Sequence, residues 1–180
     1  TAYAYNSSLT PPDDSSWSGY FLEGVQAFSI QLTVFDNRPL ISKGEVGEPR
    51  LFILGNSSQP SNASDWITLH SPFGGTLMVH NGAIFAAYQR TVEFLPKIGG
   101  FESTFLARAV TNPPLTAEDW QIIEIDRTTQ RSATGGGSPV RLSADASGRI
   151  GLLYVFTTFE PPPSSVTHPN IKVAYTTGPW

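Results

Sequence analysis

The stretch Leu77-Met78-Val79-His80-Asn81-Gly82-Ala83-Ile84-Phe85-Ala86-Ala87-Tyr88 contains two short apolar runs separated by an Asn-Gly pair. A type I′ turn needs positive φ at both central residues, and Asn-Gly is among the strongest sequence signals for it. Short runs rich in β-branched and aromatic residues and bounded by turn residues are typical of strands. The stretch therefore predicts a tight antiparallel hairpin.

The same pattern recurs along the chain. Hairpins are also predicted over residues 32–41, around Asp36-Asn37, and over residues 142–154, around Ser147-Gly148. Each hairpin is followed by a longer loop, a third strand and a polar, Pro- or Gly-containing loop that ends at a tryptophan. The four tryptophans, 49, 54 and 60 residues apart, all have this setting and are Trp17, Trp66, Trp120 and Trp180. We therefore predict a repeat of four strands, the fourth beginning at the tryptophan.

This repeat predicts a single all-β domain over residues 1–180. Its units cover approximately residues 1–23 (partial), 24–70, 71–126 and 135–180 (partial). A sheet of four short strands has two bare faces, so neighbouring copies must stack to bury them. Radial stacking gives a β-propeller-like array of four-stranded antiparallel blades. The alternative is a β-sandwich or jelly roll in which the tryptophan positions coincide by chance.

The predicted register leaves the array incomplete. About three and a half units are fewer than the four or more blades of an ordinary propeller. The ring could be completed by a second copy in a homodimer, or by a companion segment of chain missing from this sequence. We leave both possibilities open.

Composition excludes several classes of function. The 180 residues carry a net charge of -4 and only 11 scattered basic residues, which argues against a nucleic-acid partner. No apolar run is long enough to span a membrane. Cysteine is absent, and the histidines lie in separate elements without the spacing of metal ligands. We therefore predict no metal site and no cofactor.

Two local features carry smaller predictions. Residues 115–121 resemble a helix start, but a strand-like run follows at once, so we expect a capped turn there. Glu124 and Asp126 are expected to share one face of that strand, as residues two apart do. Three N-x-Ser/Thr triplets begin at Asn6, Asn56 and Asn62, and these are either plain turn residues or glycosylation acceptors.

The hairpin at residues 143–154, followed by Ile171-Lys172-Val173-Ala174-Tyr175 and Trp180, resembles the propeller repeats of fungal and bacterial lectins and of sialidase-like proteins. Ser143 and Asp145 resemble the start of a sialidase Asp-box. The glycine falls one position late, at Gly148, and the closing tryptophan is absent. The resemblance implies a propeller fold and a carbohydrate ligand.

Chemistry-bearing residues favour binding over catalysis. The paired acids are sequence neighbours, which does not suit the two separated carboxylates of a glycosidase, so we predict no catalytic residue. Arg50 and Arg108 occupy the third strand of successive units, where guanidinium groups could bind a carboxylate or simply cover an apolar face. The repeated tryptophans could stack on a sugar or pack as core. The predicted ligand-binding residues are Trp66, Trp120, Arg50, Arg108, Tyr88 and Tyr154.

Three functions follow as hypotheses. The first is a non-catalytic, carbohydrate-binding lectin with several shallow sites between blades, because repeated weak sites raise avidity. The second is a receptor-binding or coat-surface module, such as a viral spike, that engages a protein or glycan. The third is part of a propeller-type glycosidase. We expect a secreted or extracellular location.

Overall fold

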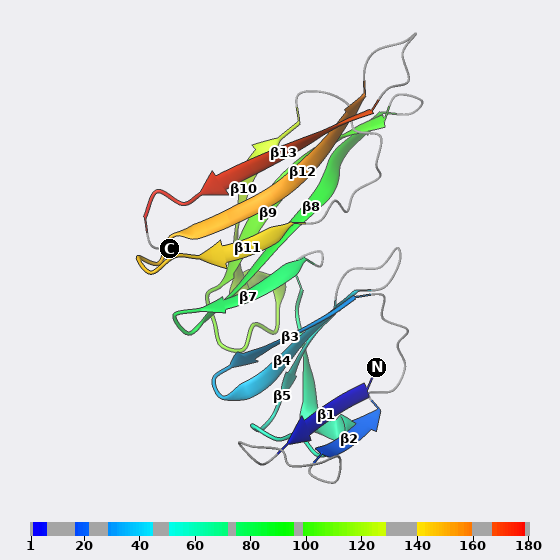
Figure 1. Cartoon of the computed structure of the whole chain (residues 1–180), viewed down its shortest axis with the longest axis vertical. Coiled ribbons are helices and arrows are strands. Elements are labelled where there is room, and N and C mark those ends of the chain that lie inside the picture. The colour runs from blue at the N-terminus through cyan, green and yellow to red at the C-terminus, as the bar shows by residue number, and fades with distance from the viewer. Residues whose placement is uncertain are drawn as a thin grey trace. The chain divides into compact units, whose positions relative to one another are not determined.

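The structure, a computed structural model, describes residues 2–6, 17–21, 29–44, 51–71, 75–95, 99–128, 140–159 and 167–178. These residues form thirteen β-strands and two short 3₁₀ turns, with no α-helix among them (Figure 1). The prediction of an all-β chain is therefore confirmed. In the described part of the chain, no helix is long and apolar enough to cross a membrane.

The chain divides into two compact units, Thr1–Ser71 and Pro72–Trp180. The division falls between the repeats predicted over residues 24–70 and 71–126. The first unit holds a two-stranded pair, β1 (Ala2–Asn6) with β2 (Trp17–Phe21), and a four-stranded sheet in the order β3-β4-β5-β6. The strands of this sheet are β3 (Ser29–Phe35), β4 (Arg38–Gly44), β5 (Leu51–Gly55) and β6 (Trp66–Leu69).

The second unit holds two sheets. One has the order β10-β9-β8-β7 and the other the order β11-β12-β13. The strands of the first sheet are β7 (Thr76–His80), β8 (Ala83–Leu95), β9 (Gly99–Ala109) and β10 (Trp120–Arg127). Those of the second are β11 (Arg141–Ala144), β12 (Ile150–Phe159) and β13 (Thr167–Tyr175).

The predicted repeat is confirmed by strand register. In three repeats a tryptophan is the first residue of the fourth strand and pairs with the last residue of the third strand. The pairs are Asn6 with Trp17, Gly55 with Trp66 and Ala109 with Trp120. Trp180 lies outside the described residues. Each four-stranded sheet is thus an antiparallel meander whose neighbours in space are also neighbours in sequence.

The hairpin turns follow their sequence signals in two cases. Asp36 and Asn37 have φ of 50° and 56°, and Asn81 and Gly82 have φ of 48° and 71°, the left-handed backbone of a type I′ turn. The β11–β12 turn is different, because the side-chain carboxylate of Asp145 accepts hydrogen bonds from residues across the turn. Its Oδ1 accepts hydrogen bonds from the backbone N–H groups of residues 147 and 149 at 2.9 and 3.0 Å, and its Oδ2 accepts one from Arg149 Nε at 2.6 Å. The Ser147 hydroxyl also donates to Oδ1, at 2.7 Å, and contributes most to lowering the pKa of Asp145; the bonds from Arg149 add to this effect.

An aspartate closes the loop before Trp66, and another closes the loop before Trp120. Asp65 Oδ2 accepts from the N–H of Ser61 at 2.7 Å, and Asp119 Oδ2 accepts from the N–H of Leu115 and of Thr116, both at 2.8 Å. Both aspartates end a three-residue 3₁₀ turn of the capping-box type. The capped turn predicted at residues 115–121 is therefore confirmed.

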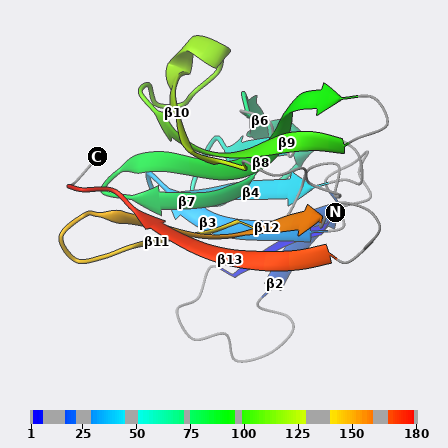
Figure 2. The same cartoon turned by 90° about the horizontal axis from the view of Figure 1, so that it is seen from above.

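The two sheets of the second unit pack face to face. Side chains from β8 and β9 meet side chains from β12 in one apolar cluster, in which the fully buried members include Leu106, Ile150 and Phe156. At one edge, β7 and β11 lie side by side (Figures 1 and 2), and the Thr76 hydroxyl donates to the carbonyl of Val140. The two repeats of the second unit therefore bury each other's faces, as stacking of small sheets requires.

The order of the strands argues against a jelly roll. Every sheet among the described strands is built in sequence order, without the crossover that a jelly roll contains. None of these sheets closes on itself. The structure thus shows an all-β array of repeated antiparallel sheets, and the propeller remains a prediction.

Candidate functional site

One face of the β11–β12–β13 sheet is turned away from the apolar cluster, and we call it the open face. Alternate residues of each strand lie on it, because side chains alternate between the faces of a sheet. It consists of Arg141, Ser143, Gly151, Leu153, Val155, Ile171, Val173 and Tyr175. The β13 members are well exposed: 73% for Ile171, 54% for Val173 and 71% for Tyr175.

Tyr175 packs against Gly151 on this face. The register places Ser143, Gly151 and Tyr175 in one row across the three strands. A β-carbon built at Gly151 would come 2.9 Å from Cε1 and 3.1 Å from Cδ1 of the Tyr175 ring, so the ring covers the glycine. Among the residues whose side-chain burial the structure describes, Tyr175 is the one aromatic side chain that belongs to the exposed large apolar groups. The open face therefore presents to solvent an aromatic ring that packs against the strand beside it.

A cation lies one row away. Arg141 pairs with Leu153, which pairs with Val173, and this row is next to the row of Tyr175. Arg141 is exposed, and no acidic residue belongs to the open face. The nearest acid in the sequence, Asp145, is held by Arg149 in an ion pair of 2.6 Å. The open face thus combines an aromatic ring, a hydroxyl at Ser143 and an arginine.

The opposite face of the sheet holds a polar cluster that joins the two sheets. A β-bulge between Glu124 and Asp126 places these residues on opposite faces of β10, so the prediction that they share a face was wrong. Glu124 accepts from the Ser103 hydroxyl at 2.6 Å. Asp126 turns toward β12 and β13, where Tyr154 Oη donates to it at 3.0 Å and Lys172 Nζ lies 2.6 Å away. Burial and the bond to Asp126 raise the pKa of Tyr154.

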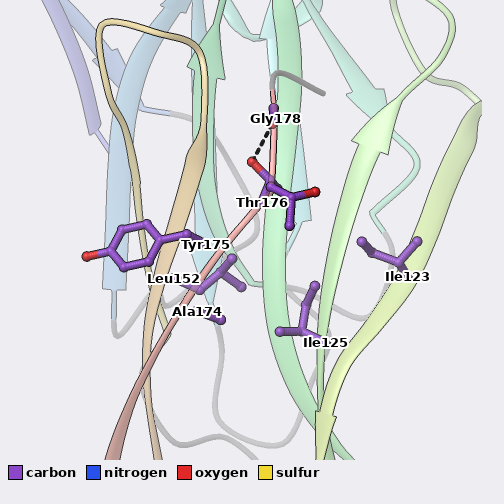
Figure 3. A pocket seen from close by; sticks show the side chains of 8 residues that line it. Ile123, Ile125, Leu152, Ala174, Tyr175, Thr176 and Gly178 are labelled. Carbon is purple, nitrogen blue, oxygen red and sulfur yellow. Dashed lines mark hydrogen bonds between the residues drawn. The ribbon is translucent and has the colours of Figure 1, made fainter.

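Beside this cluster is a pocket of about 390 Å³ between β10 and the β12–β13 pair (Figure 3). Its walls are aliphatic, and the turn after β13 completes it. The lining residues are Ile123, Ile125, Leu152, Ala174, Tyr175, Thr176, Thr177 and Gly178. Figure 3 shows the ring of Tyr175 pointing away from Ile123 and Ile125. The pocket and the aromatic surface therefore lie on opposite faces of one sheet, and no charged side chain lines the pocket.

The predicted aromatic residues do not gather in one place. Trp66 is half-buried in the first unit, whereas Trp120 in the second unit is only 6% exposed. Tyr88 stacks on Phe105 with ring centroids 5.2 Å apart and is buried, as is Tyr154 in the cluster between the sheets. In the second unit these rings pack as core and offer little surface to a ligand.

The predicted arginines also separate. Arg50 lies outside the described residues. Arg108 is half-buried on β9, and its Nε is buried without a hydrogen-bond partner. Within the described part of the chain, no group of three histidine, cysteine or acidic side chains is placed to hold a metal ion.

Sequence reasoning missed the exposed ring of Tyr175 and the arginine near it. One signal was present, because Ile171, Val173 and Tyr175 alternate along one predicted strand and so lie on the same face of it. A second signal was the comparison of repeats: the β8 segment 84–88 aligns with the β12 segment 150–154, and Phe85 in the one is Gly151 in the other. The fourth unit (residues 135–180) therefore has room for a ring where the third unit (residues 71–126) has a ring of its own.

No protein-family model matches this chain, and no curated protein or solved structure matches it either. Function must therefore be inferred from the residues themselves.

Proposed function

We propose that this protein is a non-catalytic, carbohydrate-binding module that holds a glycan on the open face of β11–β13. The observation that supports this most directly is the Tyr175 ring, 71% exposed and resting on Gly151. A ring held against a strand can stack on the apolar face of a sugar without first being ordered, which reduces the entropic cost of binding. Ser143 and Arg141 supply hydrogen-bonding groups beside it.

The open face suits a sugar better than the pocket does. The side walls of the pocket are Ile123, Ile125, Leu152 and Ala174, which cannot hydrogen-bond with sugar hydroxyl groups. Burying unpaired hydroxyl groups against such walls is costly. On the open face the hydroxyl groups that do not meet Ser143 or Arg141 stay in water.

Three variants test the proposal. Tyr175→Ala should abolish the binding of the glycans that the intact protein retains on a glycan array. Tyr175→Phe keeps the ring and should retain most of the binding. Ile171→Ala is the matched control, because Ile171 lies on the same strand and face and is 73% exposed. Failure of the intact protein to bind any glycan, or an Ile171→Ala loss equal to that of Tyr175→Ala, would overturn the proposal.

A second candidate function is a surface module that engages a protein, such as a receptor-binding or coat protein. It is favoured by the aliphatic side chains around Tyr175, namely Leu153 at 45%, Ile171 at 73% and Val173 at 54% exposure. Contiguous exposed apolar patches often mark protein interaction sites. In this case Ile171→Ala and Val173→Ala should weaken binding of the partner as much as Tyr175→Ala does, and no glycan should bind.

For the architecture, we propose that the repeated sheets are blades of a β-propeller. If a second copy or a further segment of chain completes the ring, the added blade covers the open face, so the glycan proposal applies to the chain without that added blade. The face-to-face packing of the two sheets in the second unit supports the propeller proposal, as does the sequential strand order. Measuring the mass in solution separates a homodimer from a monomer. A glycan-binding role also fits the secreted or extracellular location that we propose.

A further inference from the structure

We propose that the open face selects glycans that carry a carboxylate, with Arg141 as the residue that reads the charge. This inference rests on the proposed function and adds the class of sugar. It begins from the placement of Arg141 relative to the ring of Tyr175. The two residues share one face of one sheet, and the Gly151 position covered by the ring belongs to the strand between them.

The spacing of the sheet brings both groups within reach of one bound sugar. Adjacent strands lie about 5 Å apart, and successive rows on one face are about 7 Å apart. Because the Tyr175 ring extends over Gly151, it lies about one strand from β11, which carries Arg141. A pyranose stacked on the ring can therefore direct a substituent toward the guanidinium group.

Arg141 forms no ion pair within the described part of the chain. Arg38, Arg127, Arg149 and Lys172 each form an ion pair with an aspartate or glutamate. Arg141 takes part in none of these pairs, and the open face carries no acid. An exposed guanidinium group beside apolar side chains can bind a planar carboxylate through two parallel hydrogen bonds.

The apolar side chains around Arg141 should strengthen its preference for a carboxylate. Leu153 and Val173 lie in the same row as Arg141 and are about half exposed. Stacking a sugar there removes water from the ion pair and so strengthens it relative to a pair in bulk solvent. The protein as a whole carries a net charge of -4, so attraction of an acidic glycan depends on this local cation.

The test compares sugars that differ only in charge. Methyl glycosides of glucuronic, galacturonic and mannuronic acid are titrated against the folded full chain beside their neutral methyl esters, with binding followed by NMR. At least one free acid should bind about three- to tenfold more tightly than its ester at low salt. The preference should shrink in high salt, because an exposed ion pair is screened.

Variants assign the preference to Arg141. Arg141→Gln should remove the difference between acid and ester by weakening binding of the acid far more than binding of the ester, and Arg141→Lys should keep part of the difference. Arg127→Gln is the control, since Arg127 is similarly exposed but paired with Glu124 on another sheet. Equal binding of acid and ester by the wild-type protein would overturn this inference and leave the proposed function standing. If the wild-type protein binds none of these sugars and no glycan on an array, the proposed function itself is overturned.

Discussion

The ring of Tyr175 lies over Gly151, so close that a β-carbon there would sit 2.9 Å from the ring. Gly151→Ala should therefore lift the ring from the strand, because the far end of a side chain can move where the backbone cannot. The expected result is an affinity for glycan about three- to tenfold lower, from the lost stacking geometry, with little change in the unfolding midpoint. Titration calorimetry and thermal unfolding check the two parts.

Gly178→Ala is the matched control for this change. A β-carbon at Gly178 meets nothing within 4 Å, so the variant should bind and unfold as the wild type does. Equal affinity of the Gly151→Ala and wild-type proteins would show that the ring's position is irrelevant to binding.

Asp126 should contribute to the stability of the second unit, because it joins the β7–β10 sheet to the β11–β13 sheet. Asp126→Ala leaves the Tyr154 hydroxyl and the Lys172 ammonium group without their shared acceptor. Removing one partner of such a part-buried group costs about 1–3 kcal/mol. Asp126→Asn keeps an acceptor and should cost less. Urea unfolding of both variants measures the order, and a cost for Asp126→Ala no larger than for Asp126→Asn contradicts it.

Acid should weaken the loop before Trp120. The Thr111 side chain and the backbone N–H groups of Thr116 and Leu115 donate to Asp119 and lower its pKa from 3.8 to about 2. A carboxylate whose pKa is lowered by folding stabilises the native state above its unfolded pKa, and this contribution is lost as the pH falls from about 4 to about 2. The wild-type unfolding midpoint should therefore fall more between pH 5 and pH 2.5 than that of Asp119→Asn. Parallel curves for the two proteins would exclude this role.

The cluster between the two sheets should dominate the stability of the second unit. Leu106 is fully buried there, so Leu106→Ala should cost about 2–5 kcal/mol through lost burial and the cavity left behind. Leu115, 56% exposed on the loop before Trp120, offers the same substitution on the surface, where the change should stay within about 0.5 kcal/mol. Chemical denaturation of both variants gives the comparison. Similar losses in the two proteins would place the core elsewhere.

Much of the fold was predictable because local chemistry determines it. Asn81-Gly82 requires a backbone that few other pairs adopt, and its turn has the expected positive φ values. The tryptophan register was visible because each ring begins the same strand of the unit. The bulge beside Asp126 was not predictable, because an extra residue in a strand leaves no mark on the pattern of residue types. That bulge decides which face Asp126 occupies.

The site was harder to predict than the fold. Aromatic type alone drew attention to Trp120, Tyr88 and Tyr154, which are all buried. Residue type cannot tell a core ring from a surface ring when every strand alternates. Exposure depends on which neighbour covers each face, and only the packing of β12 against β8 and β9 showed that the face with Tyr175 is the open one.

The connection between the third and fourth strands has one length in the three repeats where the structure describes it: the paired residue and its tryptophan are eleven positions apart at Asn6–Trp17, Gly55–Trp66 and Ala109–Trp120. The second and third strands, by contrast, grow from seven and five residues in β4 and β5 to thirteen and eleven in β8 and β9. The described repeats therefore differ in length at the end of the sheet away from the tryptophan, while the connection closed by aspartate keeps one length. A recognition loop grafted at the variable end should leave the alignment of Trp66 and Trp120 unchanged.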